Sequence, residues 1–249
     1  MRICVAGWYF ADPKNRIGLK AMVEFYGILR QANKKHPVFV VSHFKPDFLE
    51  TTGLPHKDIG IYGLEFRCYD WYIRNEWDGE SSVLFMHDDE KIAGPWVFDQ
   101  IAKLKHDQAY IFEDFAEAEA NGGKHGRGIY CSKKFIDFIL KFECKCTESI
   151  DHYDNHNPGV LLPGVGPHTG FWYDPWNRGD HYEGKPPFGV RHYNTSIWHF
   201  AGIVGRAKGE KLDVGNKVFI PGFESGRRGT FGAYERARKV FAEKGKPKK

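Results

Sequence analysis

The chain has 249 residues, a formal net charge of +4 at pH 7, and 41% hydrophobic residues. This length suffices for one large domain with a substantial core, or for two small domains. The five cysteines follow no regular framework, which argues against a disulfide scaffold and favours reduced thiols in a cytoplasmic setting. We expect no secretory signal and no membrane span, because no apolar segment has the required length.

The first 41 residues have the pattern of a strand, a helix and a second strand. Residues 2–6 predict a strand that stops at Gly7. Apolar residues at helical spacing from Ile17 to Leu29 predict a helix that ends at the basic Lys34 and Lys35, and residues 37–41 predict the second strand. Such a unit belongs to a parallel sheet with right-handed crossovers.

Further elements alternate along the next hundred residues. Residues 46–63 are rich in turn formers, and residues 108–120 fit either a short strand at 109–112 or a helix. Ser132 has the character of a helix N-cap. The remaining expected elements are helices at 64–77, 95–104 and 133–142 and strands at 83–86 and 129–131.

The composition changes toward the C-terminus. Residues 147–194 are dominated by Gly, Pro, His, Asp, Tyr and Trp and show little periodicity, so we expect a long irregular insertion there. Residues 196–204 predict a last strand, and residues 231–244 predict a final helix within a basic tail.

The most informative segment is Val83–Glu90, where four large apolar residues and His87 lead into three consecutive acids. An unbroken apolar run predicts a strand buried on both faces. In open α/β sheets ligands bind beyond the carboxyl ends of the strands, so Asp88 and Asp89 are expected at a crevice. Adjacent carboxylates suit Mg²⁺ or Mn²⁺. The alternative is a solvated acidic turn that leads into a helix.

The order of these parts resembles the GT-A fold of nucleotide-sugar-dependent glycosyltransferases, which mark their metal site with an Asp-x-Asp motif, and is similar to family-2-like transferases. The resemblance is carried by the N-terminal strand–helix–strand unit, by Phe85–Asp89 and by Gly126–Lys134. It implies an α/β fold with a mostly parallel central sheet flanked by helices. It departs from the family pattern because the acids are contiguous and preceded by His87.

The resemblance also implies a metal site. Asp88 would face the ribose or a metal-bound water, and Asp89 would ligate Mn²⁺ or Mg²⁺ on the donor diphosphate. His199 would be a further metal ligand, with His192 as second choice, although a histidine in an apolar segment can equally be a core residue.

A catalytic base is required only if the enzyme inverts configuration. The resemblance places such a carboxylate at Asp151 or Asp154, within reach of the acceptor hydroxyl. An Asx-type turn before Pro158 explains the same residues without catalysis.

The donor would be a nucleotide-diphosphate sugar, most readily a UDP-sugar. Gly7 and Trp8 would let the base approach and stack, with His43 nearby, and Arg67 would contact phosphate. The glycine segment, with Gly126 and Gly128, would approach the donor sugar. Trp8 and Arg67 also fit a core aromatic and a solvated helix residue.

A single domain then divides into three parts along the chain. These are a nucleotide-sugar-binding part at residues 1–145, an irregular acceptor side at 146–225 and a basic helix or tail at 226–249. The acceptor class stays open among glycan, protein and nucleic acid, DNA included, because the basic tail favours nucleic acid only slightly.

Two other functions stay open. A metal-dependent hydrolase or phosphotransfer enzyme could combine Asp88 and Asp89 with His152 or His156, although Pro158 disfavours a helix that would align those histidines. A non-catalytic module could instead bind carbohydrate or DNA through its aromatic loops. P-loop and dinucleotide-binding fingerprints are absent from the sequence.

Overall fold

The computed structural model describes residues 1–7, 16–42, 47–59, 64–88, 90–120, 128–141 and 209–225. The helices are α1 (Arg16–Ala32), the 3₁₀ helix η1 (Asp47–Thr52), α2 (Leu64–Asn75), α3 (Trp96–Ile101), α4 (Phe115–Ala120) and α5 (Lys133–Ile139). The strands are β1 (Arg2–Ala6), β2 (Val38–Ser42), β3 (His56–Asp58), β4 (Val83–His87), β5 (Glu90–Ile92), β6 (Gln108–Phe112), β7 (Gly128–Cys131), β8 (Asn216–Phe219) and β9 (Phe223–Ser225).

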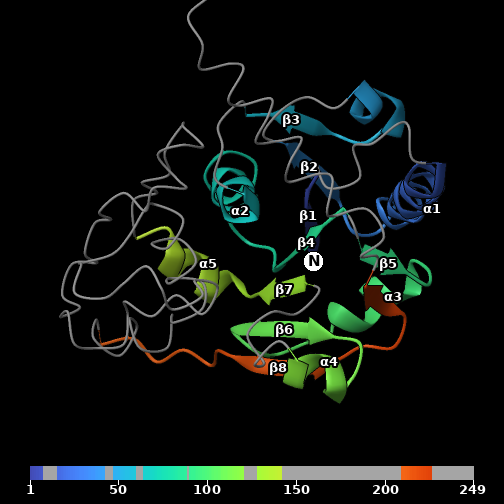
Figure 1. Ribbon diagram of the computed structural model, residues 1–249. Coiled ribbons are helices and arrows are strands. Elements are labelled where there is room, and N and C mark those ends of the chain that lie inside the picture. The colour runs from blue at the N-terminus through green and yellow to red at the C-terminus, as the bar shows by residue number, and fades with distance from the viewer. Residues whose placement is uncertain are drawn as a thin grey trace, which may run out of the picture.

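Seven of these strands form one sheet in the order β3-β2-β1-β4-β7-β6-β8, which runs from top to bottom in Figure 1. Neighbouring strands are parallel except at β7, which is antiparallel to both β4 and β6. Strands β5 and β9 pair separately as a small antiparallel sheet. The molecule is therefore a mixed α/β protein with a mostly parallel sheet, compatible with a Rossmann-like fold.

Helices cover both faces of the sheet (Figure 1). On one face α2 and α5 pack against Val83 and Phe85 of β4, and on the other α1 and α3 pack against Leu84 and Met86. These four side chains have no exposed surface. The prediction of a strand buried on both faces is confirmed, and the unbroken apolar run follows from the two helical layers.

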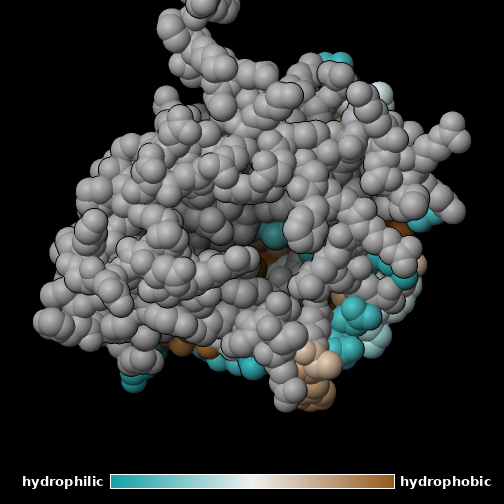
Figure 2. All heavy atoms as spheres, viewed as in Figure 1, coloured by the Kyte–Doolittle hydropathy of each residue, from teal (hydrophilic) through white to brown (hydrophobic). Residues whose placement is uncertain are grey.

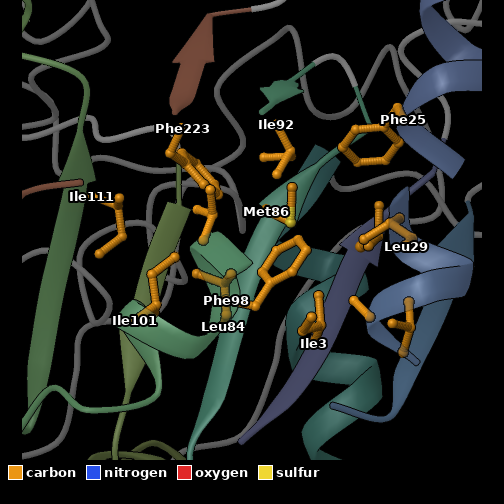
Figure 3. Packing of buried hydrophobic residues seen from close by; sticks show 14 of the residues in the cluster. Ile3, Phe25, Leu29, Leu84, Met86, Ile92, Phe98, Ile101, Ile111 and Phe223 are labelled. Carbon is orange, nitrogen blue, oxygen red and sulfur yellow. The ribbon is translucent and has the colours of Figure 1, made fainter. Parts of the chain in front are cut away.

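Figure 3 shows the core on the α1 and α3 face. Side chains of Phe25, Phe98 and Phe223 come from two helices and the small second sheet, and they point toward Leu84 and Met86 of β4. The second sheet, which carries Phe223, is thereby packed onto the same core as the main sheet. It holds the chain segment that follows the acidic end of β4 close to α1 and α3.

The direction in which strands are added to the sheet reverses between β1 and β4. Helix α1 connects β1 to β2 along one face of the sheet, whereas α2 connects β3 to β4 along the other face. As a result β2 lies on one side of β1 and β4 on the other. The carboxyl ends of β1 and β4 therefore form a topological switch point, where open α/β sheets leave a crevice for a ligand.

The edge strand β8 is attached at its beginning by a polar cluster. Asp107 accepts hydrogen bonds from the Asp213 backbone N–H at 2.9 Å, from Lys134 Nζ at 2.9 Å and from Ser132 Oγ at 3.1 Å. Asp213 in turn accepts from Asn216 Nδ2 at 2.9 Å. These bonds fix residues 209–216 against the start of β6, so a distant segment of the sequence completes the sheet.

The last residue of β8, Phe219, contacts aromatic rings of neighbouring elements. The ring of Phe115 in α4 packs at a tilt against Phe219, with centroids 4.0 Å apart, and Phe115 remains 74% exposed. Figure 2 shows hydrophobic residues at the bottom of the view, where α4 lies in Figure 1.

Most expected elements are confirmed, with small shifts at their ends. The strand alternative for residues 109–112 is confirmed by β6, and Ser132 caps α5 by accepting a hydrogen bond from the Phe135 backbone N–H at 3.3 Å. The sequence did not predict β3, β5, β8 or β9. Its expectations for residues 147–194, 196–204 and 231–244 lie outside the described residues.

None of the helices in the described ranges is long and apolar enough to cross a membrane.

Candidate functional site

Asp88 lies at the switch point, one residue beyond β4. Its backbone N–H donates to the Ala6 carbonyl oxygen at 3.2 Å, which extends the pairing of β4 with β1 by one residue. Ala6 pairs with both His87 and Val41, so the ends of β1, β2 and β4 are level. Asp88 has no exposed surface, although a carboxylate is costly to bury.

Tyr26 of α1 reaches this carboxylate from the neighbouring layer. Its hydroxyl donates to Asp88 Oδ2 at 3.4 Å, and its side chain is 4% exposed. Burial raises the pKa of Tyr26, and the charge of Asp88 and the hydrogen bond to it raise the pKa further. The phenol therefore stays protonated and neutral as a donor. Phe25 packs edge-on against the Tyr26 ring, with centroids 5.3 Å apart.

Gly7 adjoins the same pair. Its N–H donates to the Val41 carbonyl oxygen at 2.9 Å. A Cβ atom here would lie 2.3 Å from Val40 Cγ1 and 3.1 Å from Tyr26 Oη. The missing side chain thus makes room for Val40 and for the phenol. The approach of a nucleotide to the Gly7 backbone stays a prediction.

Gly128 begins β7 beside the end of β4, where it pairs with Met86. A Cβ atom would lie 2.9 Å from Leu84 Cδ1, 3.2 Å from the Phe85 carbonyl oxygen and 3.2 Å from Phe223 Cζ. Glycine therefore lets β7 and the second sheet pack closely on β4. Its approach to a donor sugar stays a prediction.

Two further polar residues flank Asp88 along the chain. The His87 ring stacks on Tyr69 of α2, with centroids 6.4 Å apart and planes 17° apart. Glu90 begins β5, pairs with Ser225 of β9 and is 4% exposed. The sequence marked Glu90 only as part of the acidic run, and it gave no sign that Tyr26 would contact Asp88.

The structure brings Gly7, Asp88 and Gly128 to one edge of the sheet. Arg67 lies in α2, but its side chain is outside the described part. The other predicted residues also lie outside the described residues, and their roles stay predictions: Trp8, His43, Asp89, Gly126, Asp151, Asp154, His192 and His199. Among the residues that the structure describes, no three His, Cys, Asp or Glu side chains form a group that could hold a metal ion.

The fold and this edge define a mixed α/β protein with a candidate ligand site at the switch point. No family model and no curated protein matches the chain. One solved structure similar to it is the crystal structure of the Aq1419 protein from Aquifex aeolicus VF5, with 14% sequence identity and a TM-score of 0.41. That match covers 57% of this chain and 75% of the other.

Proposed function

We propose that this chain is a metal-dependent glycosyltransferase of the GT-A type. It would move a sugar from a nucleotide-diphosphate sugar, most readily a UDP-sugar, to an acceptor hydroxyl. The observation that carries the proposal is Asp88, a fully buried carboxylate beyond a central strand at the topological switch point. Buried carboxylates are usually paired or coordinate metals, and switch points bind ligands.

The geometry of the edge supports a diphosphate donor. The ends of β1, β2 and β4 are level, so Gly7 and Asp88 lie together at one edge of the sheet. Asp88 and Asp89 would hold a Mn²⁺ or Mg²⁺ ion, for which carboxylate oxygens are suitable ligands. When bound, the ion acts as a Lewis acid that neutralises charge on the departing diphosphate.

Other residues take the roles that the family resemblance assigns. His199 would complete the metal site, and the backbone at Gly126 and Gly128 would approach the sugar. Asp151 or Asp154 would accept the proton of the acceptor hydroxyl if the reaction inverts configuration. The acceptor would bind to residues within 146–225.

Titration of the full chain with UDP, with and without Mn²⁺, tests the proposal. We expect UDP to raise the melting temperature only when Mn²⁺ is present, and Asp89→Ala and Asp88→Asn to remove that rise. Glu80→Ala is the control, because Glu80 is exposed and precedes β4, at the end of the strand away from Asp88. Stabilisation by a glycan or by DNA, without any response to nucleotide and metal, would instead identify a binding module.

A further inference from the structure

Asp88 is held from the α1 layer as well as from its own strand. The α1 helix packs against β1 and β2 through one face, and Tyr26 lies on that face with Met22 and Leu29. Unlike those two side chains, Tyr26 ends in a hydroxyl group, which reaches Asp88 Oδ2 at 3.4 Å. A residue of the apolar layer thus supplies a polar contact at the candidate site.

Gly7 makes this contact sterically accessible. A Cβ atom at residue 7 would stand 3.1 Å from the phenolic oxygen, closer than most real Cβ contacts. The same atom would press into Val40 Cγ1 at 2.3 Å. The glycine after β1, the tyrosine of α1 and the acid after β4 therefore form one packed unit across three elements.

We propose that Tyr26 is a positioning residue for the donor site, which holds the Asp88 carboxylate in one orientation by hydrogen bonding, and that Gly7 leaves the space it needs. This inference rests on the proposed function. It adds a residue from the first helix to a site otherwise assigned to strand ends.

The phenol of Tyr26 is a suitable hydrogen-bond donor for this role. A lysine or arginine in the same place would orient Asp88 and also cancel its charge. A neutral phenol orients the carboxylate by hydrogen bonding and adds no positive charge beside it. The distance of 3.4 Å is long for a hydroxyl–carboxylate bond. Hydrogen bonds of this kind often shorten only when the ligand is bound.

Tyr26→Phe in the full chain is the matched test, since it removes one oxygen atom and keeps the ring. Residues that orient metal ligands typically contribute a factor of about 10 to 100 in affinity or activity. We therefore expect about a tenfold or greater rise in the Mn²⁺ concentration that half-saturates UDP binding, measured by calorimetry. The melting temperature without ligand should change little.

Tyr110→Phe is the control for loss of a buried hydroxyl. Tyr110 is 3% exposed and accepts a hydrogen bond from Gln108 Nε2 at 3.3 Å within β6, away from Asp88. We expect this variant to bind Mn²⁺ and UDP as the unmodified chain does. A merely structural role for Tyr26 would instead make the two variants alike.

The outcomes separate the two proposals. If Asp88→Asn abolishes Mn²⁺-dependent UDP binding while Tyr26→Phe binds normally, the positioning role is refuted and the proposed function stands. If the unmodified chain shows no Mn²⁺-dependent UDP binding, the proposed function is refuted and the positioning role with it. Weakened metal dependence in Tyr26→Phe alone, with an unchanged melting temperature, supports both.

Discussion

Replacing Gly7 with alanine tests how tightly the end of β1 is packed. The added Cβ would lie 2.3 Å from Val40 Cγ1, 3.1 Å from Tyr26 Oη and 3.5 Å from Leu49 Cδ2. Val40 has no exposed surface, and a β-branched residue has little freedom at χ1, so it cannot rotate away. Overpacking in a core costs about 1–3 kcal/mol, and we expect about 3 kcal/mol here because the closest neighbour is rigid.

The measurement is urea denaturation at 25 °C followed by tryptophan fluorescence, together with calorimetric melting. A loss of about 3 kcal/mol corresponds to a fall of roughly 6–12 °C in melting temperature for a chain of this size. The comparison variant is Gly27→Ala, because Gly27 is the residue next to Tyr26 in α1. A Cβ at Gly27 would meet nothing within 4 Å.

Gly27→Ala should therefore stabilise the protein by about 0.5–1 kcal/mol, because alanine favours a helix interior over glycine. The two changes add the same methyl group and are expected to act in opposite directions. A Gly7→Ala chain as stable as the unmodified one would show that β1, β2 and α1 do not meet as closely as described. The contact between Tyr26 and Asp88 would then lose its packing basis.

Two further predictions concern polar contacts away from the site. Ser132→Ala should cost about 1 kcal/mol, because the Ser132 hydroxyl accepts from the Phe135 N–H at the start of α5, and Ser132→Thr should retain most of that stability in the same denaturation assay. Burial raises the pKa of Asp78, but hydrogen bonds from the Ser81 and Glu80 amides, the Ser81 hydroxyl and the charge of Arg2 outweigh it and lower the pKa to about 2. The folded pKa lies below the unfolded value of 3.8, so ionised Asp78 stabilises the protein above about pH 4 and this contribution disappears as the pH falls toward 2. Because the side chain is 39% exposed, we expect Asp78→Ala to cost only about 1 kcal/mol at pH 7; an equal difference from the unmodified chain at pH 3 and pH 7 would contradict the assignment.

The sequence predicted the elements whose residue types reflect their surroundings, as buried apolar residues and helix-capping residues do. β4 was predicted because both of its faces are covered, and α5 because Ser132 has a helix-capping side chain. β3 consists of His56, Lys57 and Asp58, none of them apolar, and it is a strand only because it pairs with β2. β8 is an edge strand with incompletely buried residues. Strand propensity depends on packing partners, which a sequence does not show for edge positions.

The residues of the candidate site also differ in whether the sequence could predict them. Asp88 and Gly7 could be predicted because they follow apolar strands, and the ends of parallel strands meet at one edge. Tyr26 could not, because its spacing from Met22 and Leu29 assigns it to the apolar face of α1. That assignment is correct for the ring, and only the packing of α1 on the sheet brings the hydroxyl to Asp88.

Acidic residues at the two ends of the strands have different hydrogen-bond partners. At the start of β6, Asp107 is paired with Lys134 Nζ at 2.9 Å, and hydrogen bonds from Asn216 and His106 lower the pKa of Asp213. Those charges are balanced within the chain and hold β8 in place. At the carboxyl edge, the contact from α1 to Asp88 comes from Tyr26, a neutral phenol that donates a hydrogen bond to the carboxylate. Under the proposed function, Asp88 would hold the cation that arrives with the nucleotide, at the edge where the connections around β1 diverge.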